Sequence, residues 1–304
     1  MFVRLPSFLS GDAILKSNAL AGRLALLLAA LIWGSSFVIM KNTVDDLPVF
    51  LLLAIRFSIS FLVLGAVFFR RLKGLDRRFV LGGMLCGAML IIAYSLQTFG
   101  LVGTTPGKNA FLTAVYCVLV PFMAWMFFRR RPSVWNWLAA GLCVAGIGLV
   151  SLDGGLSMAP GDALSLLSGV CYALHIMALS RLGEKGDVFS LSIIQFGTAA
   201  LLAWMLHLLT DPGAPMPALQ IWPQLGYLSV CCTCVAITLQ AVGQKLTPPS
   251  QAAILLSLES VFGVLFSLLS GAETITFQLA AGFALIFVSV IVSETQLSFL
   301  RRRG

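Results

Sequence analysis

Long apolar stretches alternate with short polar ones along nearly the whole chain. Glycine, proline and clusters of charge separate ten apolar segments, each long enough for a helix that crosses a bilayer. The predicted helices cover residues 24–43, 48–69, 79–100, 105–128, 134–152, 161–181, 188–209, 221–244, 250–271 and 275–296. The connections between them are short, which predicts antiparallel neighbours in one all-α polytopic membrane protein.

The composition supports a membrane protein rather than a soluble domain. Hydrophobic residues make up 59% of the 304 residues, charged residues make up 11%, and the mean hydropathy is +0.98. A soluble domain carries about 25% charged residues. All seven cysteines fall in apolar segments, which is typical of small buried side chains rather than of a disulfide framework or a metal site.

The basic residues predict the orientation of the chain in the membrane. With a cytoplasmic N-terminus, 17 of the 20 lysines and arginines fall on the cytoplasmic side. Lys41 and Lys108 fall outside, and Arg56 lies within the second predicted helix. Both termini are therefore expected in the cytoplasm. The bias also explains the net charge of +8 without nucleic acid as a partner.

The two halves of the chain resemble each other. The segment "LQTFGLVGTTPGKNAFL" (96–112) aligns without a gap with "LQAVGQKLTPPSQAAIL" (239–255), so that Gln97 matches Gln240 and Pro106 matches Pro249. Each half holds five predicted helices, and an odd number makes the second half enter the membrane from the opposite side. Such inverted repeats are a feature of secondary transporters, with substrate sites near the midplane between the repeats.

Four parts follow from this pattern. Residues 1–23 are expected to form a cytoplasmic N-terminal segment, at the membrane surface or disordered, and residues 297–304 a basic cytoplasmic tail. Residues 24–152 are expected to form the first five-helix repeat, and residues 161–296 the second.

Several segments together resemble a known family. They are "WGSSFVIMK", "LLLAIRF", "PGKNAFLTAVYCVLVPFMAW", "GDALSLLSGVCYALHIMALSR" and "PPSQAAILLSLESVFGVLFSLLSGAE". As a set they resemble the drug/metabolite transporter superfamily, in particular its EamA-type branch. The resemblance implies that predicted helices 1–4 and 6–9 surround a central cavity, with helices 5 and 10 at its edge. The family often has Glu-Pro in the ninth helix. Here Glu259 precedes Ser260, which removes the proline that would kink the helix.

Glu259 lies near the centre of the ninth predicted helix, with no other charged residue between Ala252 and Ala272. An ionisable group at that depth is a candidate for function. Three roles are open: binding a cationic group of a substrate, carrying a proton, or pairing with Arg56. In the repeat alignment Glu259 is the counterpart of Tyr116.

Polar residues at helical spacing indicate which helix faces point inward, because polar groups facing lipid are costly. The cavity candidates are Glu259, Arg56, Tyr116, Tyr94, Gln97, Asn109, Tyr172, His175, Gln240 and Trp33. Most of these could instead hold helices together, and Trp33 could pack against a neighbour. His175 is either a proton relay or a buried, hydrogen-bonded histidine. Arg56 either binds a substrate carboxylate or neutralises Glu259, and the two groups facing one cavity would suit a zwitterion.

The predicted function is secondary transport of small organic solutes across a bacterial inner membrane by alternating access. The family resemblance favours export, of metabolites such as amino acids or of toxic compounds; proton coupling through Glu259 and simple exchange both stay open. The sequence holds no P-loop, HExxH or GxSxG motif, so we expect no direct use of ATP, no enzymatic activity, no cofactor and no metal. The expected partners are a small-molecule substrate and the lipid bilayer, and the sequence does not decide between a monomer and a homodimer. The alternative is a membrane scaffold or assembly factor without transport.

Overall fold

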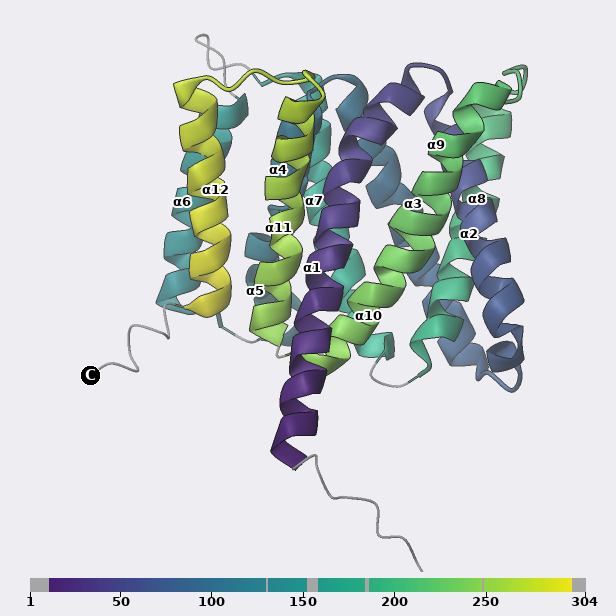
Figure 1. Ribbon diagram of the computed structural model, residues 1–304, viewed down its shortest axis with the longest axis horizontal. Coiled ribbons are helices and arrows are strands. Elements are labelled where there is room, and N and C mark those ends of the chain that lie inside the picture. The colour runs from purple at the N-terminus through teal and green to yellow at the C-terminus, as the bar shows by residue number, and fades with distance from the viewer. Residues whose placement is uncertain (1–10, 130, 152–157, 184–185, 248, 297–304) are drawn as a thin grey trace, which may run out of the picture.

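The computed structural model describes residues 11–129, 131–151, 158–183, 186–247 and 249–296, and the elements of these ranges are helices (Figure 1). The first half holds α1 (Gly11–Val44), α2 (Val49–Phe68), η1 (Phe69–Leu72), α3 (Arg77–Val102), α4 (Pro106–Thr113), α5 (Tyr116–Phe128) and α6 (Val134–Ser151). The second half holds α7 (Pro160–Gly183), α8 (Val188–Thr210), η2 (Leu219–Ile221), α9 (Trp222–Gly226), η3 (Tyr227–Val235), α10 (Ala236–Leu246), α11 (Pro249–Leu269) and α12 (Phe277–Thr295).

The helices are long and apolar enough for a multi-pass membrane protein. Over the described residues, nine segments could each cross a membrane by length and composition, and Leu255–Leu269 within α11 is a shorter apolar helix. The count of ten spans stays a prediction. Helix α1 begins at Gly11, so residues 11–23 of the expected N-terminal segment are helical rather than disordered. The basic tail at 297–304 lies outside the described residues.

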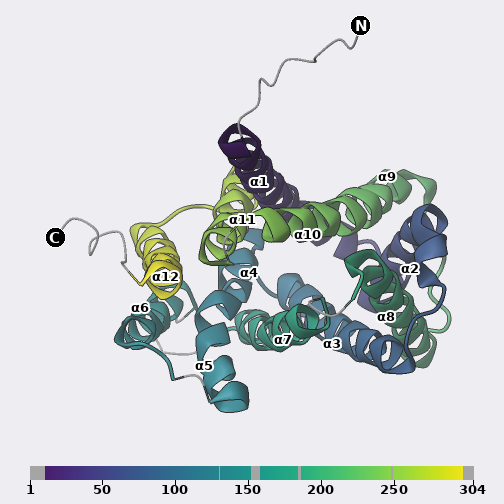
Figure 2. The same ribbon diagram turned by 90° about the horizontal axis from the view of Figure 1, so that it is seen from below.

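The two halves interleave instead of forming separate lobes. Helix α6 packs against α12 at one edge, α2 packs against α8 at the other, and α4 packs against α11 between them (Figures 1 and 2). Helix α1 contacts α10 and α11, while α3 contacts α7 and α8. Three of these contacts join a helix to its own counterpart in the other half. The expected place of helices 5 and 10 at the edge is confirmed by α6 and α12.

The first helices of the two halves run in opposite directions. Lys41, in the last turn of α1, donates to the carbonyls of Leu101 and Val102 at the end of α3, each at 2.9 Å. Thr104, which follows α3, donates to Asp162 in the first turn of α7. Helix α1 therefore ends at the face where α7 begins, as an inverted repeat requires.

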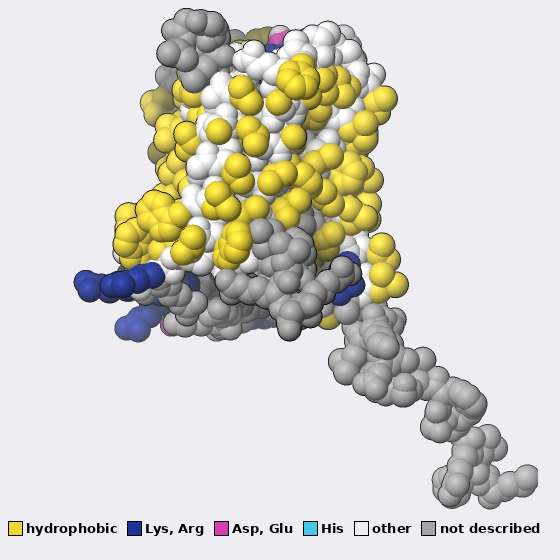
Figure 3. All heavy atoms as spheres, turned by 90° about the vertical axis from the view of Figure 1, so that its left-hand side faces the viewer, with side chains coloured by type: hydrophobic (Ala, Val, Ile, Leu, Met, Phe, Trp, Pro, Cys, Tyr) yellow, Lys and Arg dark blue, Asp and Glu magenta, His cyan; other side chains and the backbone are white. Residues whose placement is uncertain are grey.

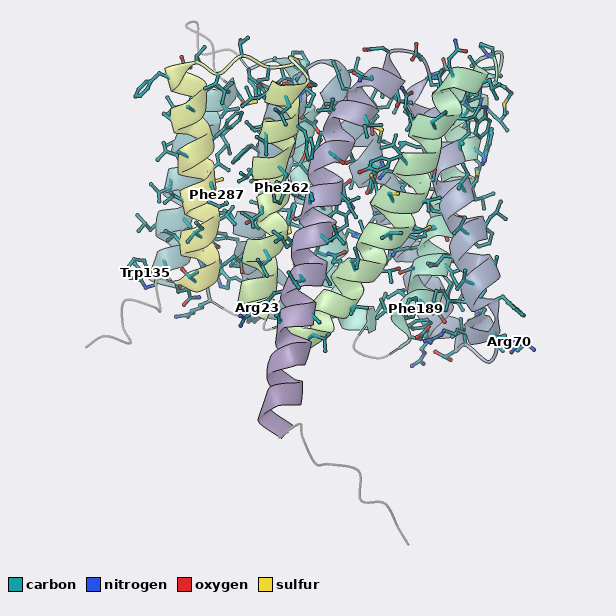
Figure 4. All side chains as sticks on the ribbon, viewed as in Figure 1. Arg23, Arg70, Trp135, Phe189, Phe262 and Phe287 are labelled. Atoms are coloured by element: carbon teal, nitrogen blue, oxygen red, sulfur yellow. The ribbon has the colours of Figure 1, made fainter. Side chains whose placement is uncertain are left out.

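The opposite face is where α1 begins and α12 ends (Figure 1). Arg23 and Arg70 lie toward this face (Figure 4). The basic residues predict that it is cytoplasmic. The wall formed by α6 and α12 is mostly hydrophobic, and basic side chains gather near the lower left of this view (Figure 3). The wall exposes large apolar residues such as Val134 at 82% and Phe277 at 91%. Such a wall suits contact with lipid tails.

Two predicted helices are irregular. The fourth is interrupted between Thr113 and Tyr116, and Pro121 within α5 lacks the N–H that would continue the ladder. The eighth contains η3, a π-helix. The ninth, α11, continues through Glu259 and Ser260, in agreement with the absent proline. Irregular backbone at membrane depth is tolerated where it is buried in protein or lines a cavity.

Helices α1 and α11 approach closely beside Glu259. A Cβ at Gly34 would lie 2.4 Å from the Cβ of Phe262 and 3.0 Å from the carbonyl oxygen of Glu259. A Cβ at Gly263 would lie 2.7 Å from the Cβ of Ala110 on α4. Any larger residue at these positions would push α11 away from its neighbours, so the two glycines fix where Glu259 lies.

Candidate functional site

A single cavity in the middle of the bundle is lined by all ten predicted residues. They are Trp33 from α1, Arg56 from α2, Tyr94 and Gln97 from α3, Asn109 from α4, Tyr116 from α5, Tyr172 and His175 from α7, Gln240 from α10 and Glu259 from α11. Its lining includes no described residue of α6 or α12. The structure brings the candidates together, and their part in binding or coupling stays a prediction.

Arg56 places a buried guanidinium at the cavity. Its side chain is 2% exposed. Its Nε donates to Thr233 Oγ1 at 2.9 Å, its Nη2 lies 3.5 Å from the Tyr94 hydroxyl, and its Cζ lies 4.7 Å from the centre of the Tyr94 ring. Among the described residues no carboxylate forms a salt bridge with it. A buried cation held only by neutral groups is costly, so an anion entering the cavity would be favoured beside it.

Glu259 places a buried carboxyl group at the same cavity. It is 7% exposed, and its Oε1 accepts a hydrogen bond from the Tyr116 hydroxyl at 3.0 Å. No described basic side chain forms a salt bridge with it. One of its three predicted roles, direct pairing with Arg56, is therefore wrong for this structure. The guanidinium is held by Thr233 and Tyr94 instead.

Hydrogen bonds link the polar groups of α3, α4 and α7. The Tyr172 hydroxyl donates to Gln97 Oε1 at 2.9 Å, and Asn109 Nδ2 donates to Ser165 Oγ at 2.7 Å and to the Gln97 carbonyl at 3.1 Å. These bonds fit the alternative in which the side chains hold helices together. Asn109 Oδ1, however, has no partner among the described groups although the residue is fully buried. This oxygen is a buried acceptor enclosed by protein.

The remaining candidates differ in whether they face the cavity or hold helices together. His175 Nε2 lies 3.0 Å from Gln195 Oε1 and the residue is 6% exposed, which fits a buried, hydrogen-bonded histidine. Trp33 lines the cavity and also contacts a neighbouring helix, since its Nε1 donates to the carbonyl of Cys232 at 2.7 Å. Gln240 lines the cavity beside Ile237.

Gln195 and Thr233 are among the residues in or near the cavity lining that the sequence-based candidates do not include. Gln195 lines the cavity and occupies the position of Arg56 in the second half, so the repeat alignment could have indicated it. Thr233 holds Arg56, but its hydroxyl is one of several on the polar face of its helix, and no signal in the sequence distinguishes it.

A second polar cluster joins the two halves at the face where α7 begins. Thr104 Oγ1 donates to Asp162 Oδ1 at 2.5 Å, and Thr105 Oγ1 donates to Glu273 Oε1 at 2.6 Å. Lys108 Nζ lies 3.7 Å from Asp162 Oδ2. Two adjacent threonines of the first half thus bind two buried carboxylates of the second, which closes the bundle at this end.

This cluster predicts a pH dependence of stability. Burial raises the pKa of Glu273 above its ordinary value of 4.5, although hydrogen bonds from Thr105 and Ser267 and the charge of Lys108 act in the opposite direction. The native state then binds the proton of Glu273 more tightly than the unfolded state does. The stabilising contribution of this carboxyl group is therefore present below its unfolded pKa and is lost as the pH rises through its native pKa. In detergent, the stability of Glu273→Gln relative to wild type should rise as the pH rises above the ordinary value of 4.5.

Asp187 is the control with the opposite sign. Burial alone would raise its pKa, but hydrogen bonds from Ser190 and Arg71 outweigh burial and hold the pKa below its ordinary value of 3.8. The contribution of Asp187 to the free energy of unfolding is present above the unfolded pKa and is lost as the pH falls. The stability that Asp187→Asn loses relative to wild type should therefore be smallest in acid. Thermal unfolding of both variants between about pH 2 and pH 8, a range that includes the unfolded pKa of both carboxyl groups, checks the pair. Equal trends for the two would contradict the assignment.

An apolar outer wall, two interleaved halves of opposite direction and a polar cavity between them define a multi-pass membrane protein of the transporter class. The chain belongs to the EamA-like transporter family, which matches residues 20–152 and again residues 159–295. The resemblance found in the sequence is thereby confirmed.

Relatives over most of the chain are transporters by name. An uncharacterized transporter of Archaeoglobus fulgidus is 30% identical over 277 residues, which cover 88% of this chain and 84% of the relative. The uncharacterized inner membrane transporter YedA of Escherichia coli K12 is 25% identical, over 88% of this chain and 89% of the relative. A solved crystal structure superposes with a TM-score of 0.66 at 20% identity, over 95% of this chain and 99% of the other, and shares its fold. The chain is a multi-pass inner-membrane protein.

Proposed function

We propose that this transporter exports small organic solutes that carry an anionic group and a second, cationic or proton-donating group. The proposal depends chiefly on one observation: Arg56 lines the cavity, is buried, and forms no salt bridge with a described carboxylate. An anionic group of the solute would supply the missing countercharge. The direction of transport follows the family resemblance.

Glu259 supplies the second half of the proposal. Its carboxyl group lines the same cavity with the Tyr116 hydroxyl as its hydrogen-bond donor. When ionised it can receive an ammonium group of the solute, and when protonated it can carry a proton across. Either use changes the charge of the cavity during the cycle.

Alternating access is the mechanism that suits this architecture. The cavity lies between two halves of opposite direction, so rocking of one against the other would open it to each side in turn. The bonds of Thr104 and Thr105 to Asp162 and Glu273 would have to break for the end of the bundle where α7 begins to open. The scaffold alternative expects polar faces packed together without a cavity, and the lined cavity speaks against it.

The proposal is tested by comparing bacterial cells that express wild type, Glu259→Gln or an empty vector. Untargeted profiling of metabolites in the medium and in the cells should show compounds enriched outside most strongly with wild type and less with Glu259→Gln, and these should be zwitterions or amino-bearing acids. A mutant equal to wild type, with both unlike the vector, would keep transport and remove Glu259 from the mechanism. Three equal profiles would contradict export of ordinary metabolites.

A further inference from the structure

The helix that follows α9 changes its winding beside the cavity. Over Tyr227–Val235 the backbone forms a π-helix, in which each N–H bonds the carbonyl five residues earlier. Such segments are rare and frequently occur at functional sites. The side chain of Thr233 follows the same register, because its Oγ1 donates to the carbonyl of Leu228 at 2.9 Å. Thr238, in the α-helical turn beyond, donates to the carbonyl of Cys234, only four residues earlier.

This register leaves Thr233 as an acceptor for Arg56. A hydroxyl has one proton and two lone pairs, whereas a guanidinium only donates. With its proton given to Leu228, Thr233 Oγ1 presents a lone pair to Arg56 Nε at 2.9 Å. The two side chains are 0% and 2% exposed. An α-helical register would direct the hydroxyl to the carbonyl of Ser229, four residues earlier, and so turn it away from its present place beside Arg56.

The same π-helix holds other groups near the cavity. The carbonyl of Cys232 accepts from Trp33 Nε1 at 2.7 Å, and Tyr227, at the start of the segment, has its hydroxyl 2.7 Å from Ser35 Oγ. Residues of α1 and α2 are thus fixed by hydrogen bonds to one short segment of the second half. The segment therefore sets the position of a charged and an aromatic side chain at once.

We propose that the π-helix Tyr227–Val235 orients the anion-binding side of the cavity, with Thr233 as the positioning residue for Arg56. The inference rests on the proposed function, because it takes Arg56 as the group that receives the anion of the solute. Thr233 acts through Arg56 and does not line the cavity itself. Its part is to aim the guanidinium so that the remaining N–H groups face the solute.

The geometry is tested without a known substrate. In protein labelled with 15N-arginine, the Nε–H resonance of Arg56 is identified by its absence in Arg56→Lys. We expect slow exchange of this proton with water in wild type and exchange about tenfold faster in Thr233→Val, which keeps the shape and removes the acceptor. Thr233→Ser should restore slow exchange. Thr238→Val is the matched control, since it removes a threonine from the same span that does not touch Arg56.

The role in transport is tested on the compound that wild type exports. Thr233→Val should raise its KM about tenfold with kcat nearly kept, and Thr233→Ser and Thr238→Val should match wild type. If Thr233→Val does not fold, Thr233→Cys replaces it, since sulfur is a weak acceptor.

Three results would overturn the inference, and they differ from one another. Unchanged exchange at Arg56 in Thr233→Val would show that the π-helix does not hold the guanidinium. Faster exchange with unchanged KM would leave the proposed function standing and remove Thr233 from it. A wild type that exports no compound would remove the proposed function and the transport role together, while the resonance still reports whether Thr233 holds Arg56.

Discussion

Methionine in place of Arg56 is expected to abolish export while leaving the protein as stable as wild type, or more stable. Burying an ion costs several kcal/mol, and Arg56 has only neutral partners to offset that cost. Methionine removes the charge and fills similar space, at the expense of the acceptor role of Thr233, worth about 1–3 kcal/mol. Loss of the countercharge for a solute anion costs about 2–5 kcal/mol, or roughly 30-fold or more in affinity.

Two measurements separate these effects. Thermal unfolding in detergent should give a melting temperature for Arg56→Met at or above that of wild type, and export of the identified compound should fall below detection. Arg71→Met is the matched control, because Arg71 pairs with Asp187 at 2.6 Å with a side chain that is 48% exposed. It should export normally. A strongly destabilised Arg56→Met would instead assign Arg56 a structural role.

Glutamine in place of Glu259 is expected to uncouple the transporter from the proton gradient. The amide oxygen can still accept from the Tyr116 hydroxyl, so the fold should be kept. The amide carries no titratable proton. Wild type that exchanges one proton for each solute could sustain about a tenfold concentration ratio across a gradient of one pH unit. Glu259→Gln should reach a ratio of about one under the same gradient.

The measurement uses proteoliposomes with an imposed pH gradient and the identified compound inside and outside. Glu294→Gln is the matched control, because Glu294 also lies in a transmembrane segment, on α12, and does not line the cavity. It should accumulate the compound like wild type. If Glu259→Gln still accumulates the compound, a group other than Glu259 carries the proton. If the variant loses all exchange, Glu259 takes part in solute binding.

Much of the candidate site could be predicted because a membrane makes the sequence easy to interpret. Polar residues such as Asn109 and Tyr172 must avoid lipid, so their helical spacing alone indicates the inner face. The repeat then relates Tyr116 to Glu259, which the structure joins by a hydrogen bond. Each of these inferences depends on the spacing of polar residues along a helix and on the position of a residue within its predicted span. Both are local properties of the chain.

The partners of the charged groups could not be predicted in the same way. Arg56 and Glu259 lie at similar expected depth, yet Arg56 binds Thr233, 177 residues away in the sequence. The π-helix that allows this bond is itself fixed by distant donors, among them Trp33. Hydropathy reports which face of a helix is polar, and not whether each N–H bonds the carbonyl four or five residues earlier. The interruption before Tyr116 escaped prediction for the same reason.

The hydrogen bond between Tyr116 and Glu259 has a consequence for how such a protein can arise. The two residues are counterparts in the repeat, so two separate copies of a single half would bring identical side chains together there. Two glutamates at 3.0 Å could not both be ionised, and two tyrosines would hold no carboxylate. Joining the halves in one polypeptide lets each mutate alone. A phenol on one half and an acid on the other is an arrangement that a fused chain can reach and two identical copies of one half cannot.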